Sequence, residues 1–337
     1  MKVITRHALF WPGIALALLL VASAAFNPGF LALTWRDGHL YGSVVDILNR
    51  AAPLIIVSLG MTLVIAVRGL DISVGATLAI AAVVAALMIG GGFSADGQVA
   101  SRYPLWLALA TALAAAAACG LWNGLLVVKA GMQPIVATLI LMVAGRGIAQ
   151  LLSGGQIITV YYPPFFVIGN GYLLGLPVAL WIAGALWVAV HLVLARTALG
   201  LFIRAIGGNP EAARVAGVRA SSITLCVYTF CGLAAGIAGL IVSSNVKSAD
   251  ANNAGQLLEL DAILAVTLGG TALTGGRFTL AGTVLGALII QTLTSMIYSL
   301  GVPPEVNLVV KAALVFAVML LQSPEFRGLV LRGAPRR

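Results

Sequence analysis

Long apolar runs alternate with short polar segments along the whole chain, and this pattern predicts membrane-spanning helices. A helix of roughly 20 apolar residues crosses a bilayer. Such runs fall near residues 8–26, 51–67, 74–91, 104–128, 134–152, 174–195, 223–246, 261–275, 279–298 and 305–322. The eighth run is short and rich in glycine, so we expect a broken or tilted helix there. The predicted fold class is all-α: a polytopic membrane protein with about ten transmembrane helices, forming one transmembrane domain over residues 1–337.

The composition agrees with a membrane protein and excludes other classes. Hydrophobic residues make up 61% of the 337 residues, and charged residues only 9%. Such a chain has too few polar side chains to cover the surface of a water-soluble protein. A β-barrel is not expected, because the apolar runs are unbroken and do not alternate with polar residues. The formal net charge of +9 does not indicate a nucleic-acid partner, since the basic residues are scattered singly between apolar runs.

Lysine and arginine residues are distributed unevenly between the two sides of the predicted membrane. If the N-terminus is cytoplasmic, the inner segments hold Lys2, Arg6, Arg68, Lys129, Arg196, Arg204, Arg214, Arg219, Arg277, Arg327, Arg332, Arg336 and Arg337. The outer segments hold only Arg36, Arg50, Arg102 and Lys247. This positive-inside asymmetry predicts that both termini are cytoplasmic. The first run, with Ala22-Ser23-Ala24 near its end, also resembles a cleavable secretory signal, and both interpretations stay open.

Signatures of enzymes and metal sites are absent from the sequence. A phosphate-binding P-loop needs a Gly-Lys pair, but each of the four lysines follows Met or Val. The segment Leu152-Ser-Gly-Gly-Gln156 spells the signature of ATP-binding-cassette ATPases, and without a P-loop we interpret it as a coincidence at a helix end. The cysteines Cys119, Cys226 and Cys231 have no metal-type spacing. No cofactor, metal site or catalytic residue is therefore expected.

Two basic residues lie within the predicted spans, each about 9 Å from the outer end at 1.5 Å per residue: Arg146 and Lys311. A charge in lipid is costly, so each should face the bundle interior or a wet cavity. Arg146 shares a helical stripe with Thr138 and Gln150, and Lys311 shares one with Asn307. These stripes predict a polar path for substrate through the membrane.

Each of these residues also has a structural interpretation. Arg146 either lines the path or pairs with an acid of another helix, Asp261 or Glu259. Lys311 either contacts substrate or extends toward the outer surface. Two amide side chains within the spans are either substrate contacts or interhelical hydrogen-bonding groups: Asn123 and Gln291. The sequence leaves these alternatives open.

The longest polar interruption in the second half of the chain, residues 196–222, carries signals for a short helix. Asn209 is a good N-cap, and Pro210 fits the first helical position. Gly217 is placed to end the helix. We therefore predict a cytoplasmic helix of about two turns from Pro210 to Ala216.

Small and charged side chains cover this predicted helix. Glu211 complements the helix dipole and Arg214 is expected to be exposed, while Ala212, Ala213 and Val215 are small and apolar. A helix that lies on a membrane surface needs large apolar residues, which are missing here. The helix is suited to a groove on another protein. The alternative is an ordinary linker between two spans.

Long and specific blocks of the chain carry a family resemblance. They include Gly69-Leu-Asp-Ile-Ser-Val-Gly75, Gly207-Gly-Asn-Pro-Glu-Ala-Ala-Arg-Val-Ala-Gly217, Ala249-Asp-Ala-Asn-Asn-Ala-Gly255 and Leu258-Glu-Leu-Asp-Ala-Ile-Leu-Ala-Val266. In these blocks the chain resembles the permease subunits of bacterial ABC sugar importers, in the branched-chain permease superfamily. The resemblance is to the ribose type and most closely to the galactofuranose type, and it covers nearly the whole chain.

This resemblance implies a multi-pass permease of the bacterial inner membrane that imports a monosaccharide, galactofuranose or a related pentose or hexose. It implies three protein partners: cytoplasmic ABC ATPase subunits, a periplasmic sugar-binding protein and a second permease, either a copy or a paralogue. The permease itself is also in contact with membrane lipid. ATP hydrolysis belongs to the ATPase subunits, so the chain itself is expected not to be an enzyme. The loop before the seventh span acts as the coupling helix in that family, which assigns contact with the ATPase to Asn209, Pro210, Glu211, Ala212, Ala213, Arg214 and Gly217.

One alternative from another class stays open, a stand-alone secondary carrier for a small polar solute. Proton-coupled carriers usually keep a titratable acid in mid-membrane. Here Asp71 and Asp261 stand at the ends of predicted spans. This placement favours the ATP-driven importer.

Overall fold

The computed structural model describes residues 9–36, 38–90, 92–93, 99–301 and the isolated positions 306, 308–310, 312–313, 316 and 320. The protein is mostly helical, at 72%. Among the described residues, six helices are long and apolar enough to cross a membrane: α2 (Ser43–Ala66), α4 (Leu105–Val128), α5 (Pro134–Ser153), α7 (Val178–Arg196), α10 (Ala220–Val246) and α12 (Leu280–Ser299).

Shorter helices and small two-stranded sheets complete the described structure. The shorter helices are α1 (Phe10–Phe26), α3 (Val74–Ile89), α6 (Pro163–Asn170), α8 (Leu199–Gly208), α9 (Pro210–Val215) and α11 (Leu258–Leu268). The strands form antiparallel pairs: β1 (Thr34–Arg36) with β2 (His39–Tyr41), β3 (Gly92–Phe93) with β4 (Val99–Ala100), β5 (Ile158–Thr159) with β8 (Ser248–Ala249), and β6 (Tyr172–Leu173) with β7 (Leu176–Pro177).

Each of the first nine apolar runs overlaps a helix, although only six of those helices meet the length and apolarity needed to cross a membrane. The eighth run, 261–275, overlaps α11, whose 11 residues span about 16 Å at 1.5 Å per residue. This helix is too short to cross a bilayer alone, as expected from the glycines that follow it. The tenth run, 305–322, lies outside the described residues apart from the isolated positions.

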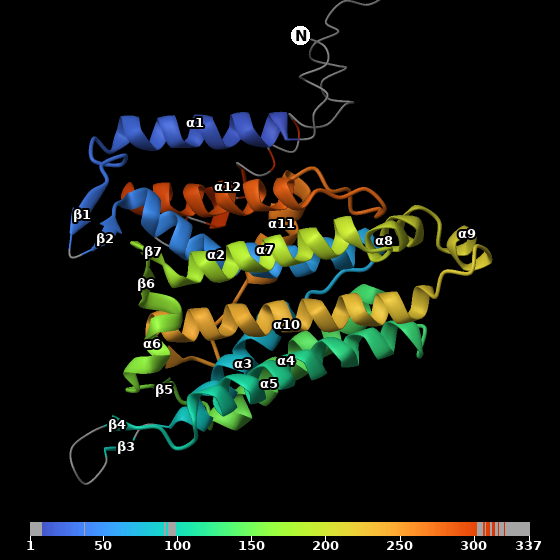
Figure 1. Ribbon diagram of the computed structural model, residues 1–337, viewed down its shortest axis with the longest axis horizontal. Helices are drawn as coiled ribbons and strands as arrows, with labels where there is room; N and C mark the ends of the chain where they lie inside the picture. Colours follow the sequence, from blue (N-terminus) through green and yellow to red (C-terminus); the bar gives the residue numbers. More distant parts are fainter. Residues whose placement is uncertain are drawn as a thin grey trace, which may run out of the picture.

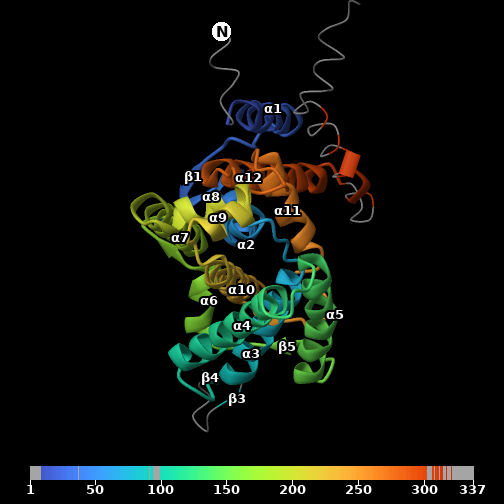
Figure 2. The same cartoon turned by 90° about the vertical axis from the view of Figure 1, so that its right-hand side faces the viewer.

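Helix α10 lies at the centre of the bundle, between a group formed by α1, α2, α7, α11 and α12 and a group formed by α3, α4 and α5 (Figure 2). It packs against α2, α3 and α4. Glycines permit this close approach: a Cβ on Gly232 would lie 2.9 Å from the Cα of Gly120, and a Cβ on Gly239 would lie 3.3 Å from the Cα of Leu78. Small residues of this kind stabilise helix packing in lipid, where backbones must come close to gain contact.

The two ends of the bundle differ in their connections. Helices α2, α4 and α7 run toward the end where α8 and α9 lie, whereas the β-hairpins gather at the opposite end (Figure 1). The basic residues that follow or end these three helices therefore lie at the same end of the bundle as α9: Arg68, Lys129 and Arg196. Helix α9 therefore lies at the end where the sequence analysis predicts the cytoplasmic basic residues.

Candidate functional site

The polar interruption at residues 196–222 folds into α8 and α9, separated by Asn209 in an extended conformation. The Asn209 Oδ1 atom accepts hydrogen bonds from the backbone N–H groups of Glu211 and Ala212, both at 3.1 Å. Pro210 occupies the first turn, where its missing N–H costs nothing. Gly217 follows the helix with φ +82°, and the Gly217 N–H donates to the Arg214 carbonyl at 3.0 Å. The predicted helix and its caps are present, and the helix ends at Val215, one residue before the predicted end.

Helix α9 projects from the end of the bundle (Figure 1). The Glu211 and Arg214 side chains are 79% and 75% exposed and form an ion pair at 3.1 Å, which contributes little to stability at such exposure. Val215 is 83% exposed, and Ala212 is exposed as well. Ala213 is the member of the predicted set that is buried against the rest of the chain. The outward surface of α9 is therefore formed by Ala212, Val215 and the charged pair.

A polar pocket of about 450 Å³ lies between α5, the start of α3 and the segment that leads into α11. It is lined by Ala76, Met142, Val143, Arg146, Gly147, Gln150, Asn252, Gln256, Leu257 and Glu259. Donor side chains and acceptor side chains both face this pocket, which suits a ligand that carries several hydroxyl groups.

Arg146 anchors the backbone of the segment that forms one wall of this pocket. Its Nη1 donates to the carbonyl oxygens of Ala251 at 3.1 Å and Ala254 at 2.7 Å. Gln150, one helical turn further, donates through Nε2 to Asn252 Oδ1 at 2.8 Å. Arg146 and Glu259 line the same pocket without forming an ion pair. The Arg146 guanidinium thus holds the loop and borders the cavity at the same time.

Asp250 closes the same loop with its carboxylate. Oδ1 accepts from the backbone N–H groups of Asn252 and Asn253, and Oδ2 accepts from Asn253 Nδ2 at 2.8 Å. Burial acts to raise the pKa of the Asp250 carboxyl, but these hydrogen bonds and the nearby Arg146 guanidinium outweigh it and lower the pKa below its ordinary value. The loop therefore carries a negative charge beside Arg146 at neutral pH.

Two other predicted path residues lie outside this pocket and hold the turn between α2 and α3. Asn123 is buried and donates through Nδ2 to Ser73 Oγ at 2.8 Å and to Asp71 Oδ1 at 3.3 Å. Thr138 Oγ1 accepts from the Ile72 N–H at 3.3 Å. The Asn123 contacts are of the interhelical kind considered for this residue, whereas Thr138 is expected from the sequence only to line the path.

Of the remaining predicted path residues, only Gln291 is described by the structure. Gln291 is half-buried on α12 and is not among the residues that line the polar pocket. Asn307 and Lys311 lie outside the described residues. Of the predicted set, the structure brings together Arg146 and Gln150.

The sequence analysis missed Asn252 and Gln256 as lining residues, and it considered Glu259 only as an ion-pair partner. They belong to a polar stretch between two apolar runs, which was the available signal. Their convergence on Arg146 depends on the fold of the segment from Lys247 to Leu258, and no periodicity reveals that fold.

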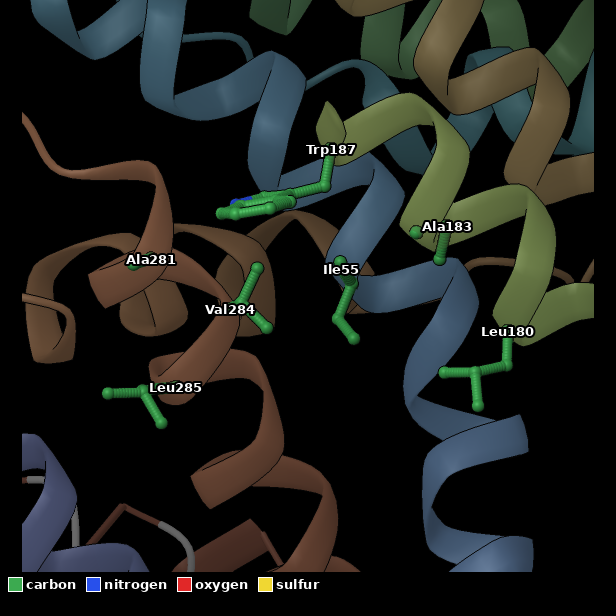
Figure 3. A pocket seen from close by; sticks show the side chains of 8 residues that line it. Ile55, Leu180, Ala183, Trp187, Ala281, Val284 and Leu285 are labelled. Atoms are coloured by element: carbon green, nitrogen blue, oxygen red, sulfur yellow. The ribbon is translucent and has the colours of Figure 1, made fainter. Parts of the chain in front are cut away.

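A second pocket, of about 430 Å³, differs in chemistry. It lies between α2, α7 and α12, where Trp187 extends from α7 toward Ala281 and Val284 of α12 (Figure 3). Its other labelled lining residues are Ile55, Leu180, Ala183 and Leu285. Apart from the Trp187 indole N–H, the lining side chains offer no partners to hydroxyl groups, so this pocket suits a polar ligand less well than the first.

Comparison with protein families decides the class. The family model described as "Branched-chain amino acid transport system / permease component" matches residues 43–319. The chain belongs to this permease family. The permease is 48% identical over 317 residues to the galactofuranose transporter permease protein of Escherichia coli (strain K12), covering 94% of this chain and 90% of the relative.

Two further relatives are import permeases for other sugars. The fructose import permease protein of Bifidobacterium longum (strain NCC 2705) is 36% identical over 334 residues, covering 97% of this chain and 91% of the relative. The ribose import permease protein of Escherichia coli (strain K12) is 35% identical over 314 residues, covering 92% of each. No solved structure matches the chain.

These relationships make the chain a multi-pass permease of the bacterial inner membrane and a transport protein, not an enzyme. A permease needs a path for its solute and a contact for whatever drives it. Within the described structure, the polar pocket beside Arg146 and the exposed helix α9 are candidates for these two tasks.

Proposed function

We propose that the permease forms the membrane path of an ATP-driven importer for a monosaccharide, galactofuranose or a related pentose or hexose. The observation that carries this proposal is helix α9: a capped, exposed helix at one end of a chain that has no P-loop of its own. The 48% identity to a galactofuranose transporter permease favours that sugar over the others.

The proposed assembly contains cytoplasmic ABC ATPase subunits, a periplasmic sugar-binding protein and a second permease, either a copy or a paralogue. The permease itself is one transmembrane domain over residues 1–337 with about ten spans, and both termini are cytoplasmic. Residues 196–222 form the coupling loop. Within it Ala212, Val215 and the pair Glu211–Arg214 present the surface of α9 to a groove on the ATPase, because these side chains are exposed.

The polar pocket is proposed as a transient binding site along the sugar path. Arg146 and Gln150 offer N–H donors, whereas Glu259 and Asn252 offer acceptor oxygens, so hydroxyl groups find both kinds of partner. Several of these groups already bond to one another or to backbone carbonyls. A sugar must exchange those bonds, which favours the weak binding that a transport path requires.

Reconstitution tests the proposal. The purified permease is placed in liposomes with its ATPase, the sugar-binding protein and ATP, and uptake of radiolabelled galactofuranose, ribose and fructose is measured. We expect uptake that needs all three proteins and ATP, with galactofuranose taken up best. Uptake by the permease alone under an ion gradient would overturn the proposal in favour of a secondary carrier.

The contact with the ATPase has its own test. Glu211→Lys reverses one charge on the outward surface of α9, whereas Glu211→Gln keeps its shape. We expect Glu211→Lys to separate ATP hydrolysis from uptake, with Glu211→Gln close to wild type, since a reversed charge opposes docking and a neutral one does not. If both variants couple as the wild type does, residues 196–222 are a linker.

A further inference from the structure

The end of helix α8 is held by a single arginine from the turn between α2 and α3. Arg68 Nε donates to the Gly207 carbonyl at 2.7 Å, and Arg68 Nη2 donates to the Gly208 carbonyl at 2.6 Å. The last carbonyls of a helix have no partner inside the helix and lie at its negative end. The planar Arg68 guanidinium satisfies both of them at once, which a lysine ammonium does with poorer geometry.

Arg68 occupies a strained position to make this contact. Its φ is +64°, in the left-handed region that residues other than glycine rarely adopt. The backbone there ends α2: the Arg68 N–H donates to the Ile65 carbonyl and the Gly69 N–H donates to the Val64 carbonyl, both at 2.9 Å. Glycine is the usual residue at such a helix end. An arginine at this position therefore indicates that its side chain has a functional role.

Beside this contact the backbones of Ala66, Gly207 and Gly276 lie directly against one another. The Gly276 N–H donates to the Ala66 carbonyl at 3.0 Å. A Cβ on Gly207 would collide with the Ala66 carbonyl and lie 2.7 Å from the Cα of Gly276, and a Cβ on Gly275 would lie 2.7 Å from Arg68 Cγ. Packing this tight cannot absorb a displacement by moving side chains to other rotamers. A shift of α8 must therefore shift the end of α2.

The turn held by Arg68 leads directly to the polar pocket. Residues 69–73 connect Arg68 to α3, and Ala76 of α3 lines the pocket. At the start of α3 a Cβ on Gly75 would lie 2.5 Å from Glu259 Oε2 and would collide with the Gly255 carbonyl. The α3 backbone thus touches the wall of the pocket, while α9 follows α8 after the single residue Asn209.

We propose that Arg68 is the positioning residue that carries movement of the α8–α9 unit through the α2–α3 turn to the polar pocket. This inference rests on the proposed function, since it takes α9 as the helix that the ATPase moves. The route is α9, α8, Arg68, the start of α3, and then Gly255 and Glu259.

The test uses the complete transporter in liposomes and measures ATP hydrolysis and sugar uptake in the same sample. Arg68→Gln keeps a polar side chain but loses the two-point contact. We expect its uptake per ATP to fall by about fivefold or more, with ATP hydrolysis retained, and Arg68→Lys to recover part of the ratio. Lys129→Gln is the matched control, because Lys129 is an exposed basic residue that follows α4 at the same end of the bundle and lies outside residues 196–222, and its ratio should equal that of the wild type.

A second measurement does not depend on transport. Hydrogen exchange of the purified permease should become faster in Arg68→Gln both at residues 67–76 and at residues 255–259, and stay unchanged at 255–259 in Lys129→Gln. If exchange rises only around 207–217, or if uptake per ATP is unchanged, Arg68 is a structural cap and the inference is overturned. Should Arg68→Gln fail to fold, Arg68→Lys decides by the same two readouts. If the wild-type transporter shows no ATP-driven uptake, the proposed function is refuted instead.

Discussion

The polar pocket and the junction at the end of α8 both use an arginine to hold backbone carbonyls, yet they are built in opposite ways. Arg146 holds two carbonyls of a loop beside a cavity of about 450 Å³. Arg68 holds two carbonyls of α8 where glycine backbones fill the space. The first arrangement leaves room for a ligand that exchanges hydrogen bonds. The second is tightly packed where the backbones of Ala66, Gly207 and Gly276 meet, so it is suited to transmit displacement.

The difference also shows in what each region exposes. Around Arg146 the neighbouring groups are side chains with donors and acceptors, such as Gln150 and Asn252. Around Arg68 the neighbouring groups are Gly207, Gly275 and Gly276. Side chains bind solutes by rotamer adjustment, whereas close backbones move together. The polar pocket is therefore suited to binding, and the junction at the end of α8 is suited to coupling.

The largest effect is expected at Gly207, because a methyl group there collides with the backbone of α2. Gly207→Ala should lower the stability of the permease by about 2–4 kcal/mol, seen as a lower melting temperature in detergent and less monodisperse protein. Gly208→Ala is the neighbouring control, since a Cβ on Gly208 meets no atom within 4 Å. Equal melting temperatures for the two variants would show that the junction is not rigid.

The next effect is expected at Arg146, on the binding side. Arg146→Gln removes the guanidinium that holds the Ala251 and Ala254 carbonyls and borders the pocket. Sugar uptake should fall by about tenfold or more, the factor given by a loss of about 1.4 kcal/mol, while the variant still co-purifies with the ATPase. Unchanged uptake would show that Arg146 does not contribute to the sugar path.

A smaller effect is expected at Gly217, which ends α9 with φ +82° in open space. A β-branched residue is strained at such an angle, whereas asparagine tolerates it. Gly217→Val should lower uptake per ATP several-fold, on the order of a 1 kcal/mol distortion of the helix end, and Gly217→Asn should stay near wild type. The ratio of uptake to hydrolysis measures this, and equal ratios for the two variants would contradict the prediction.

The smallest effect is expected at Asn209, whose side chain caps α9 with two hydrogen bonds. Asn209→Ala should destabilise this helix by about 1 kcal/mol and lower uptake per ATP about two-fold, while Asn209→Asp keeps the acceptor oxygen and should couple normally. Faster hydrogen exchange at residues 210–216 in the alanine variant alone would confirm the cap. Equal exchange in both variants would show that the ATPase contact, not the cap, orders α9.

Local signals in the sequence predicted much of the α9 region. An asparagine before a proline, followed later by a glycine, specifies a short capped helix from neighbours along the chain, because capping depends on residues within one or two turns. The pocket could be predicted only in part. Arg146 and Gln150 share one face of α5, so their spacing brings them together. Asn252 and Gln256 instead reach the pocket through a loop that Arg146 contacts at Ala251 and Ala254, and Glu259 reaches it from the start of α11.

The amino-acid sequence by itself determined that this is a bundle of apolar helices, where α9 begins, and that the chain lacks a P-loop, since each follows from composition or from neighbouring residues. The tertiary structure alone decided that Asn123 and Thr138 hold a turn instead of lining the polar pocket. It also decided that Arg68, one scattered basic residue among many in the sequence, reaches across 139 positions to the end of α8. The physical reason is that a hydrogen bond between distant segments depends on how helices pack, and packing by small residues leaves no periodic signal for the partner.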